Sequence, residues 1–130
     1  MNRRETRIAA MQILYTSDFN NISFEAAIKC FNDGIVEDSV IELLNLVKND
    51  LEKIDSIISD SLVNYTITRL NLVDKAIIRL ATAEMLNGQD ERVAINEALE
   101  ITKEYSDHGD RKAVSFNNRL LDTISNNIVK

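Results

Sequence analysis

Residues 39–58 read SVIELLNLVKNDLEKIDSII, and their apolar side chains follow the spacing of a helix. Steps of four and three residues alternate along the stretch, at Val40, Leu44, Val47, Leu51, Ile54 and Ile58. Because side chains at these positions share one face of an α-helix, the stretch predicts a helix that packs along its whole length. Ser39 and Glu42, three residues apart, predict a capping box at its start.

Similar patterns on both sides of this stretch predict an all-α fold of six or seven helices. We expect the other helices near residues 3–17, 23–32, 61–69, 71–86, 92–105 and 111–128. The segment from Ile77 to Leu86 is apolar nearly all round, which is typical of a helix that is covered on most sides. Arg79 and Glu84 interrupt it, and a buried charge needs a partner. We expect Arg79 to pair with a neighbouring helix, whereas the sequence leaves the role of Glu84 open.

The composition agrees with a helical fold. The chain of 130 residues contains no proline and only three glycines, fewer turn residues than strand-rich folds usually need. This length suits a single domain. Within it we expect two helical sub-bundles that pack together, one formed by residues 1–63 and the other by residues 64–130.

The sequence gives no positive sign of catalysis, of a metal site or of a cofactor. The one histidine, His108, lies in a polar loop without a Cys or His partner at metal-ligand spacing. The single cysteine, Cys30, excludes an internal disulfide and indicates a reducing compartment, and its apolar helix pattern predicts a buried side chain. No apolar run approaches the roughly 20 residues that span a membrane, and the first residues do not form a secretory signal. We therefore expect a cytoplasmic protein that does not contact membranes.

Positive charge gathers near the N-terminus, although the net charge of the chain is −6. Arg3, Arg4 and Arg7 stand against a single acid, Glu5, and helix spacing lets the arginines share one surface. These residues form either a solvated face or a small site for phosphates and bases. Tyr15, two turns further on, is either a core side chain or a ring on which a base could stack.

Four segments, in order along the chain, resemble the NusB family. They are RIAAMQILY at residues 7–15, VDKAIIRLA at 73–81, VAINEALEI at 93–101 and FNNRLLD at 116–122. Arg69 and Leu70 precede the second segment and Glu84 follows it, as in the family's central helix. The third segment is the most specific, and the fourth resembles a closing Phe-Val-Asn-Gly-Val-Leu-Asp motif.

The resemblance implies an all-α fold of two packed helical sub-bundles and a function without catalysis. It implies a transcription antitermination factor that binds boxA-type RNA together with the ribosomal protein NusE. This pair would act in an RNA polymerase antitermination complex and support ribosomal RNA transcription. The chain by itself would be a monomer or a homodimer. Position by position, the implied RNA contacts are Arg3, Arg4, Arg7, Tyr15, Phe116 and Asn118. Asp74 would face the protein partner.

Some positions depart from the family pattern. Arg119 replaces the glycine of the closing motif, Lys112 and Ala113 replace an acidic residue and a serine, and Ala83 replaces a tyrosine. The loop at residues 106–110 is also longer than usual. Two alternatives therefore stay open: a helical adaptor that binds protein but not RNA, or an accessory domain that acts in trans with an RNA methyltransferase.

Overall fold

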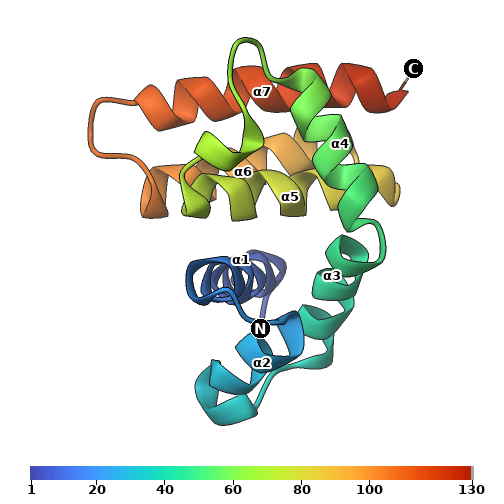
Figure 1. The fold of residues 1–130 in the computed structure, drawn as a ribbon, viewed down its shortest axis with the longest axis vertical. Helices are drawn as coiled ribbons and strands as arrows, with labels where there is room; N and C mark the ends of the chain where they lie inside the picture. Colours follow the sequence, from blue (N-terminus) through green and yellow to red (C-terminus); the bar gives the residue numbers. More distant parts are fainter. Residues whose placement is uncertain (130) are drawn as a thin grey trace.

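The computed structural model describes residues 1–129, and these form seven α-helices, two short 3₁₀ helices and no strand (Figure 1). The elements are α1 (Arg3–Asn20), α2 (Phe24–Cys30), η1 (Asn32–Gly34), α3 (Asp38–Asn49), α4 (Leu51–Ser61), η2 (Ile67–Arg69), α5 (Leu72–Leu86), α6 (Glu91–Tyr105) and α7 (Lys112–Val129). The predicted all-α fold is confirmed.

The stretch at residues 39–58 forms two helices rather than one. Asp50, between α3 and α4, has φ −122° and ψ 25°, outside the helical region. The bend lets α3 pack against α1 and α5 while α4 packs against α5 and α7 (Figure 1). The prediction of one helix was wrong because apolar spacing identifies the buried face, which runs on through the bend, and not the direction of the axis.

Three further local predictions were wrong. Helix α3 begins at Asp38 without a side-chain cap, so Ser39 and Glu42 form no capping box. The segment at residues 61–69 contributes only the last residue of α4 and the short helix η2, because its apolar residues do not repeat over enough turns to hold a helix. Cys30 is exposed, since α2 ends there and turns this side chain to solvent.

Helix α5 lies at the centre of the molecule and contacts α1, α3, α4, α6 and α7. Its residues from Ala76 to Met85 are all buried, as the predicted all-round apolar pattern requires. Arg79 is among them and donates to Asp55 of α4 at 2.9 and 2.7 Å and to Asp18 of α1 at 3.1 Å. The expected pairing of Arg79 with neighbouring helices is confirmed.

Candidate nucleic-acid interface

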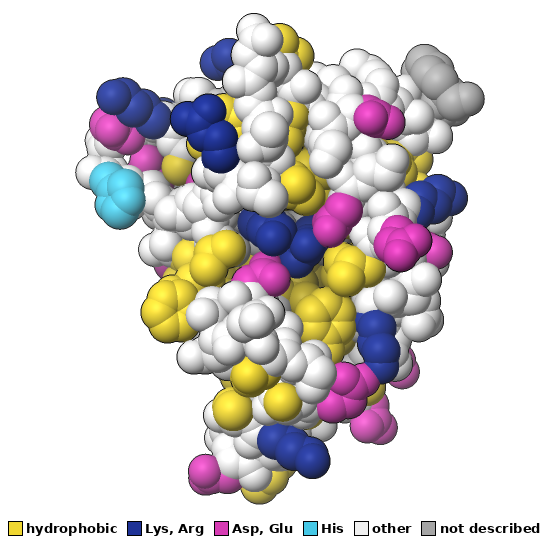
Figure 2. All heavy atoms as spheres, viewed as in Figure 1, with side chains coloured by type: hydrophobic (Ala, Val, Ile, Leu, Met, Phe, Trp, Pro, Cys, Tyr) yellow, Lys and Arg dark blue, Asp and Glu magenta, His cyan; other side chains and the backbone are white. Residues whose placement is uncertain are grey.

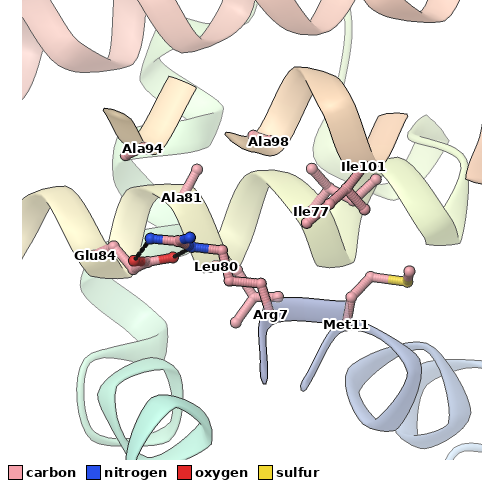
Figure 3. Close-up of a pocket in the computed structure, with 9 residues that line it drawn as sticks. All are labelled: Arg7, Met11, Ile77, Leu80, Ala81, Glu84, Ala94, Ala98 and Ile101. Carbon is pink, nitrogen blue, oxygen red and sulfur yellow. Dashed lines mark hydrogen bonds and ion pairs between the residues drawn. The ribbon is translucent and has the colours of Figure 1, made fainter. Parts of the chain in front are cut away.

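The Arg7 side chain of α1 is buried and pairs with Glu84 of α5 (Figure 3). Its Nε lies 2.8 Å from Oε1 of Glu84, and its Nη2 lies 2.9 Å from Oε2. Apolar side chains from three helices surround the pair, among them Met11, Leu80 and Ala94. A charge is tolerated in such surroundings only with a well-aligned partner, which this two-pronged geometry provides. Arg7 therefore faces a carboxylate inside the molecule and joins α1 to α5.

Arg3 and Arg4 are half exposed, and each also meets a glutamate. Nη2 of Arg3 lies 3.4 Å from Oε2 of Glu84, so Arg3 and Arg7 share this carboxylate. Arg4 donates from Nε and Nη2 to the two carboxylate oxygens of Glu97 on α6, both at 2.9 Å. The hydrogen bond from Arg4 lowers the pKa of Glu97 below its ordinary value of 4.5, although partial burial opposes this. Of the three arginines predicted to share one surface, only Arg3 and Arg4 are exposed, and in the free protein their charges are compensated.

A groove of about 420 Å³ lies beside Arg4, between α6 and α7. It is lined by Arg4, Asn96, Glu97, Leu99, Glu100, Lys103, Arg111, Val114 and Asn118. The fold therefore brings Arg4 and Asn118, from opposite ends of the chain, to one hollow that also holds two more cations. Lys103 and Arg111 were not among the predicted RNA contacts. The signal for Lys103 was its place seven residues after Asn96, on the same face of α6.

Tyr15 and Phe116 contact other aromatic rings and do not line this groove. Tyr15 stacks on the exposed ring of Phe19, with centroids 5.6 Å apart and planes at 11°. It also borders a hollow of about 280 Å³ with Met11, Gln12, Thr16, Val73 and Tyr105. Phe116 packs against Tyr65 with centroids 5.6 Å apart. The six predicted RNA contacts are therefore not gathered on one surface: Arg7 is buried, and the other five are divided among several surface features.

Asp74 lies at the start of α5, and a buried side chain of α7 holds its carboxylate. Oδ1 of Asp74 accepts hydrogen bonds from Ser106 at 2.6 Å and from Nδ2 of Asn117 at 3.1 Å. Asn117 is fully buried and donates to Thr102 as well. Asn117 was not among the predicted site residues, although its spacing of four and seven residues from Leu121 and Ile124 indicates the buried face of α7.

The face shown in Figure 2 carries lysine and arginine side chains that are interspersed with acidic and apolar ones. No wide basic surface is visible on this face, in keeping with the net charge of −6. Among residues 1–129, no three His, Cys, Asp or Glu side chains are grouped so that they could hold a metal ion. None of the helices in the same range is long and apolar enough to cross a membrane.

Comparisons with known proteins agree with the fold and with the order of the motifs. The pattern of the NusB family matches residues 4–126. A transcription antitermination protein NusB of Clostridium botulinum is 40% identical over 133 residues, covering 95% of this chain and 98% of that protein. One of Listeria innocua is 37% identical over 127 residues, covering 96% and 97%.

Solved structures give the same result. NusB of T. maritima superimposes with a TM-score of 0.82 at 28% identity, covering 97% of this chain and 92% of the other. A chain from a crystal structure of the antitermination factors NusB and NusE in complex with dsRNA gives 0.77 at 25% identity, covering 96% of each. With its family pattern, its curated relatives and its fold in agreement over nearly the whole length, the chain belongs to the NusB family.

Proposed function

We propose that this chain is a transcription antitermination factor that binds boxA-type RNA together with the ribosomal protein NusE. It would act in the RNA polymerase antitermination complex, in the bacterial cytoplasm, and support transcription of ribosomal RNA. The observation that carries the proposal is the match of almost the whole chain to antitermination proteins, one of which has been solved with NusE and dsRNA. NusB antitermination factors are RNA-binding regulatory proteins, and we propose the same regulatory, non-catalytic role here.

The groove beside Arg4 is suited to RNA. Arg4, Lys103 and Arg111 can meet phosphates, and the exposed amide of Asn118 can both donate to and accept from a base edge. The carboxylate of Glu97 holds the Arg4 guanidinium in place, and an arriving phosphate would compete with it for the same donors.

The other predicted contacts extend this proposal. Arg3 is half exposed beside Glu84 and can reach a phosphate, whereas Arg7 would have to leave its buried pair to do so. We propose that Arg7 acts mainly through its ion pair with Glu84, which holds α1 against α5 and keeps the Glu84 carboxylate next to Arg3. Tyr15 and Phe116 offer rings for stacking, and Asp74 would face NusE with a carboxylate that Ser106 and Asn117 hold in one orientation.

The experiment is a fluorescence-anisotropy titration of labelled boxA-like RNA with the chain alone, with NusE alone and with both. We expect tight binding only with both proteins. In the pair, the double variant Arg3→Ala/Arg4→Ala should bind more weakly. The slope of log K against log salt should be lower by roughly 0.7 for each phosphate that these arginines no longer neutralise.

A matched control removes two exposed positive charges that do not line the groove, as in Lys29→Ala/Lys53→Ala on α2 and α4. This variant should bind like the unchanged chain. If the chain and NusE together bound RNA no better than NusE alone, the RNA-binding proposal would be wrong. A protein-only adaptor would then remain, and pull-down of NusE would test it.

A further inference from the structure

The buried amide of Asn117 joins three helices at one end of the molecule. The start of α5, the end of α6 and the start of α7 meet there (Figure 1). Nδ2 of Asn117, on α7, donates at 3.1 Å both to Oδ1 of Asp74 on α5 and to the hydroxyl of Thr102 on α6. Ser106, directly after α6, donates to the same Oδ1 at 2.6 Å. Two hydrogen bonds from two parts of the chain therefore fix the Asp74 carboxylate.

This arrangement is unfavourable for the stability of the fold. The side chain of Asn117 is fully buried, and its Oδ1 has no hydrogen-bond partner within residues 1–129. A buried amide oxygen without a partner has lost its hydration and gained no bond in return. The closing motif that this segment resembles has a valine at the position of Asn117, and a valine would leave no polar group unsatisfied. Stability therefore does not account for an asparagine here.

The second oxygen of the Asp74 carboxylate is left for a ligand. A carboxylate oxygen accepts about two hydrogen bonds, so Ser106 and Asn117 saturate Oδ1. Within residues 1–129, Oδ2 takes part in no hydrogen bond or ion pair, and Asp74 is partly exposed. The neighbouring Lys75 lies 3.8 Å from Asp18 instead. An arginine that binds side-on needs both oxygens of a carboxylate, whereas a single donor needs only one.

We propose that Asn117 is a positioning residue for the contact between this chain and its protein partner. With Ser106, it holds Asp74 so that Oδ2 alone meets one positively charged donor of the partner, the complement of an unpaired carboxylate. The inference rests on the proposed function, in which Asp74 faces NusE, and deepens it by naming the partner's group and the residue that sets the geometry. A carboxylate that is already fixed loses less conformational freedom on binding, which offsets the loss in stability.

The test compares the affinity for NusE with the stability of the fold. Asn117→Val should weaken NusE binding about 3- to 10-fold, because the carboxylate must then be ordered during binding. Its Tm should equal or exceed that of the unchanged chain, because a buried unsatisfied group is removed. Isothermal titration calorimetry measures the affinity, and circular dichroism follows thermal unfolding. A residue with only a structural role would give the opposite result, a lower Tm with unchanged affinity.

A double-mutant cycle tests whether Asn117 acts through Asp74. In the Asp74→Ala background, Asn117→Val should leave the affinity for NusE unchanged, because no carboxylate remains to be positioned. Ser106→Ala, which removes the other hydrogen bond to Oδ1, should weaken binding only where Asp74 is present. Asp74→Ala itself should make NusE binding less sensitive to salt, because an ion pair is lost. An unchanged salt dependence would contradict a positively charged donor.

The matched control is Thr82→Val, which removes a fully buried hydroxyl that bonds only to the backbone of α5. This variant should bind NusE like the unchanged chain. If Asn117→Val bound NusE as tightly as the control, or if its Tm fell, the inference would be wrong and the proposed function kept. An equal effect of Asn117→Val with and without the Asp74 carboxylate would also overturn it. No binding of NusE by the unchanged chain would overturn both the inference and the proposed function.

Discussion

At the scale of single residues, two glutamates determine what the N-terminal arginines can do. Glu84 holds the buried Arg7 and reaches the half-exposed Arg3, while Glu97 holds Arg4 near the surface. The same residue type therefore has two roles within one helical turn of α1. Arg7 is a structural link between helices, and Arg3 and Arg4 remain within reach of a ligand.

The buried pair should make Arg7 important for stability. Arg7→Ala removes the buried partner of the Glu84 carboxylate and leaves it only the half-exposed Arg3, so we expect the free energy of unfolding to fall by about 3 kcal/mol. Replacing both partners, as in Arg7→Met/Glu84→Met, should recover much of this loss because no buried charge remains. Urea denaturation followed by circular dichroism measures both effects. A loss below about 1 kcal/mol for Arg7→Ala would contradict the buried pair.

The pair of Arg4 with Glu97 should make stability depend on pH in acid. Because the folded pKa of Glu97 lies below its ordinary value of 4.5, its contribution is fully present above pH 4.5. It is lost as the pH falls through the folded value. Thermal unfolding of the unchanged chain and of Glu97→Gln should therefore differ most near neutral pH and converge in acid. A difference in Tm that is constant from pH 7 to pH 3 would show that Glu97 does not titrate in this way.

At the scale of elements, local sequence signals determine where α5 begins and ends. Asn71 caps its start by accepting from the backbone nitrogens of Val73 at 2.8 Å and Asp74 at 3.4 Å. Asn87 and Gly88 end it, and Gly88 has φ 93°, which favours glycine. Both signals are visible in the sequence. The bend at Asp50, in contrast, contains no glycine or proline, so the sequence does not show it.

The cap at Asn71 should matter for α5 as a whole. Asn71→Ala removes the acceptor for two free backbone donors, so we expect the free energy of unfolding to fall by about 1 kcal/mol. Asn71→Asp keeps an acceptor at this position and should stay close to the unchanged chain. Parallel urea denaturation of the three proteins checks this order. Equal losses for alanine and aspartate would rule out capping as the cause.

At the scale of the whole molecule, α5 joins the two halves of the chain. Helices α1, α3 and α4 from the N-terminal half pack on it together with α6 and α7. Arg79 adds polar links from α5 to α4 and α1. The division into sub-bundles at residue 63 remains a prediction, and this shared centre suggests that neither half is complete alone.

The molecule should therefore unfold in one step. Because removing either half would uncover the buried face of α5, we expect a single cooperative thermal transition. Circular dichroism at 222 nm and the fluorescence of the tyrosines should give the same midpoint, and calorimetric and van't Hoff enthalpies should agree. Two separated transitions would show that the halves fold independently.

Much of the fold was predictable from the sequence, because a helix is a local structure. Apolar residues at steps of three and four identified the buried faces of α3 and α4, and the predicted ranges 71–86, 92–105 and 111–128 lie close to the observed α5, α6 and α7. The ordered motifs also identified the family. Each of these signals depends on only a few neighbouring residues, so it can be recognised in the sequence without knowledge of the three-dimensional structure.

The candidate site depended on the tertiary structure. Arg7 and Glu84 are 77 residues apart and Arg4 and Glu97 are 93 apart, so no local pattern could show that they pair. The same holds for the groove that Arg4 shares with Asn118 and for the contact of Tyr65 with Phe116. Sequence spacing determined which side chains each helix turns outward or inward. Only the packing of α1, α5, α6 and α7 decided which of them meet, because those distances are set by the core between the helices.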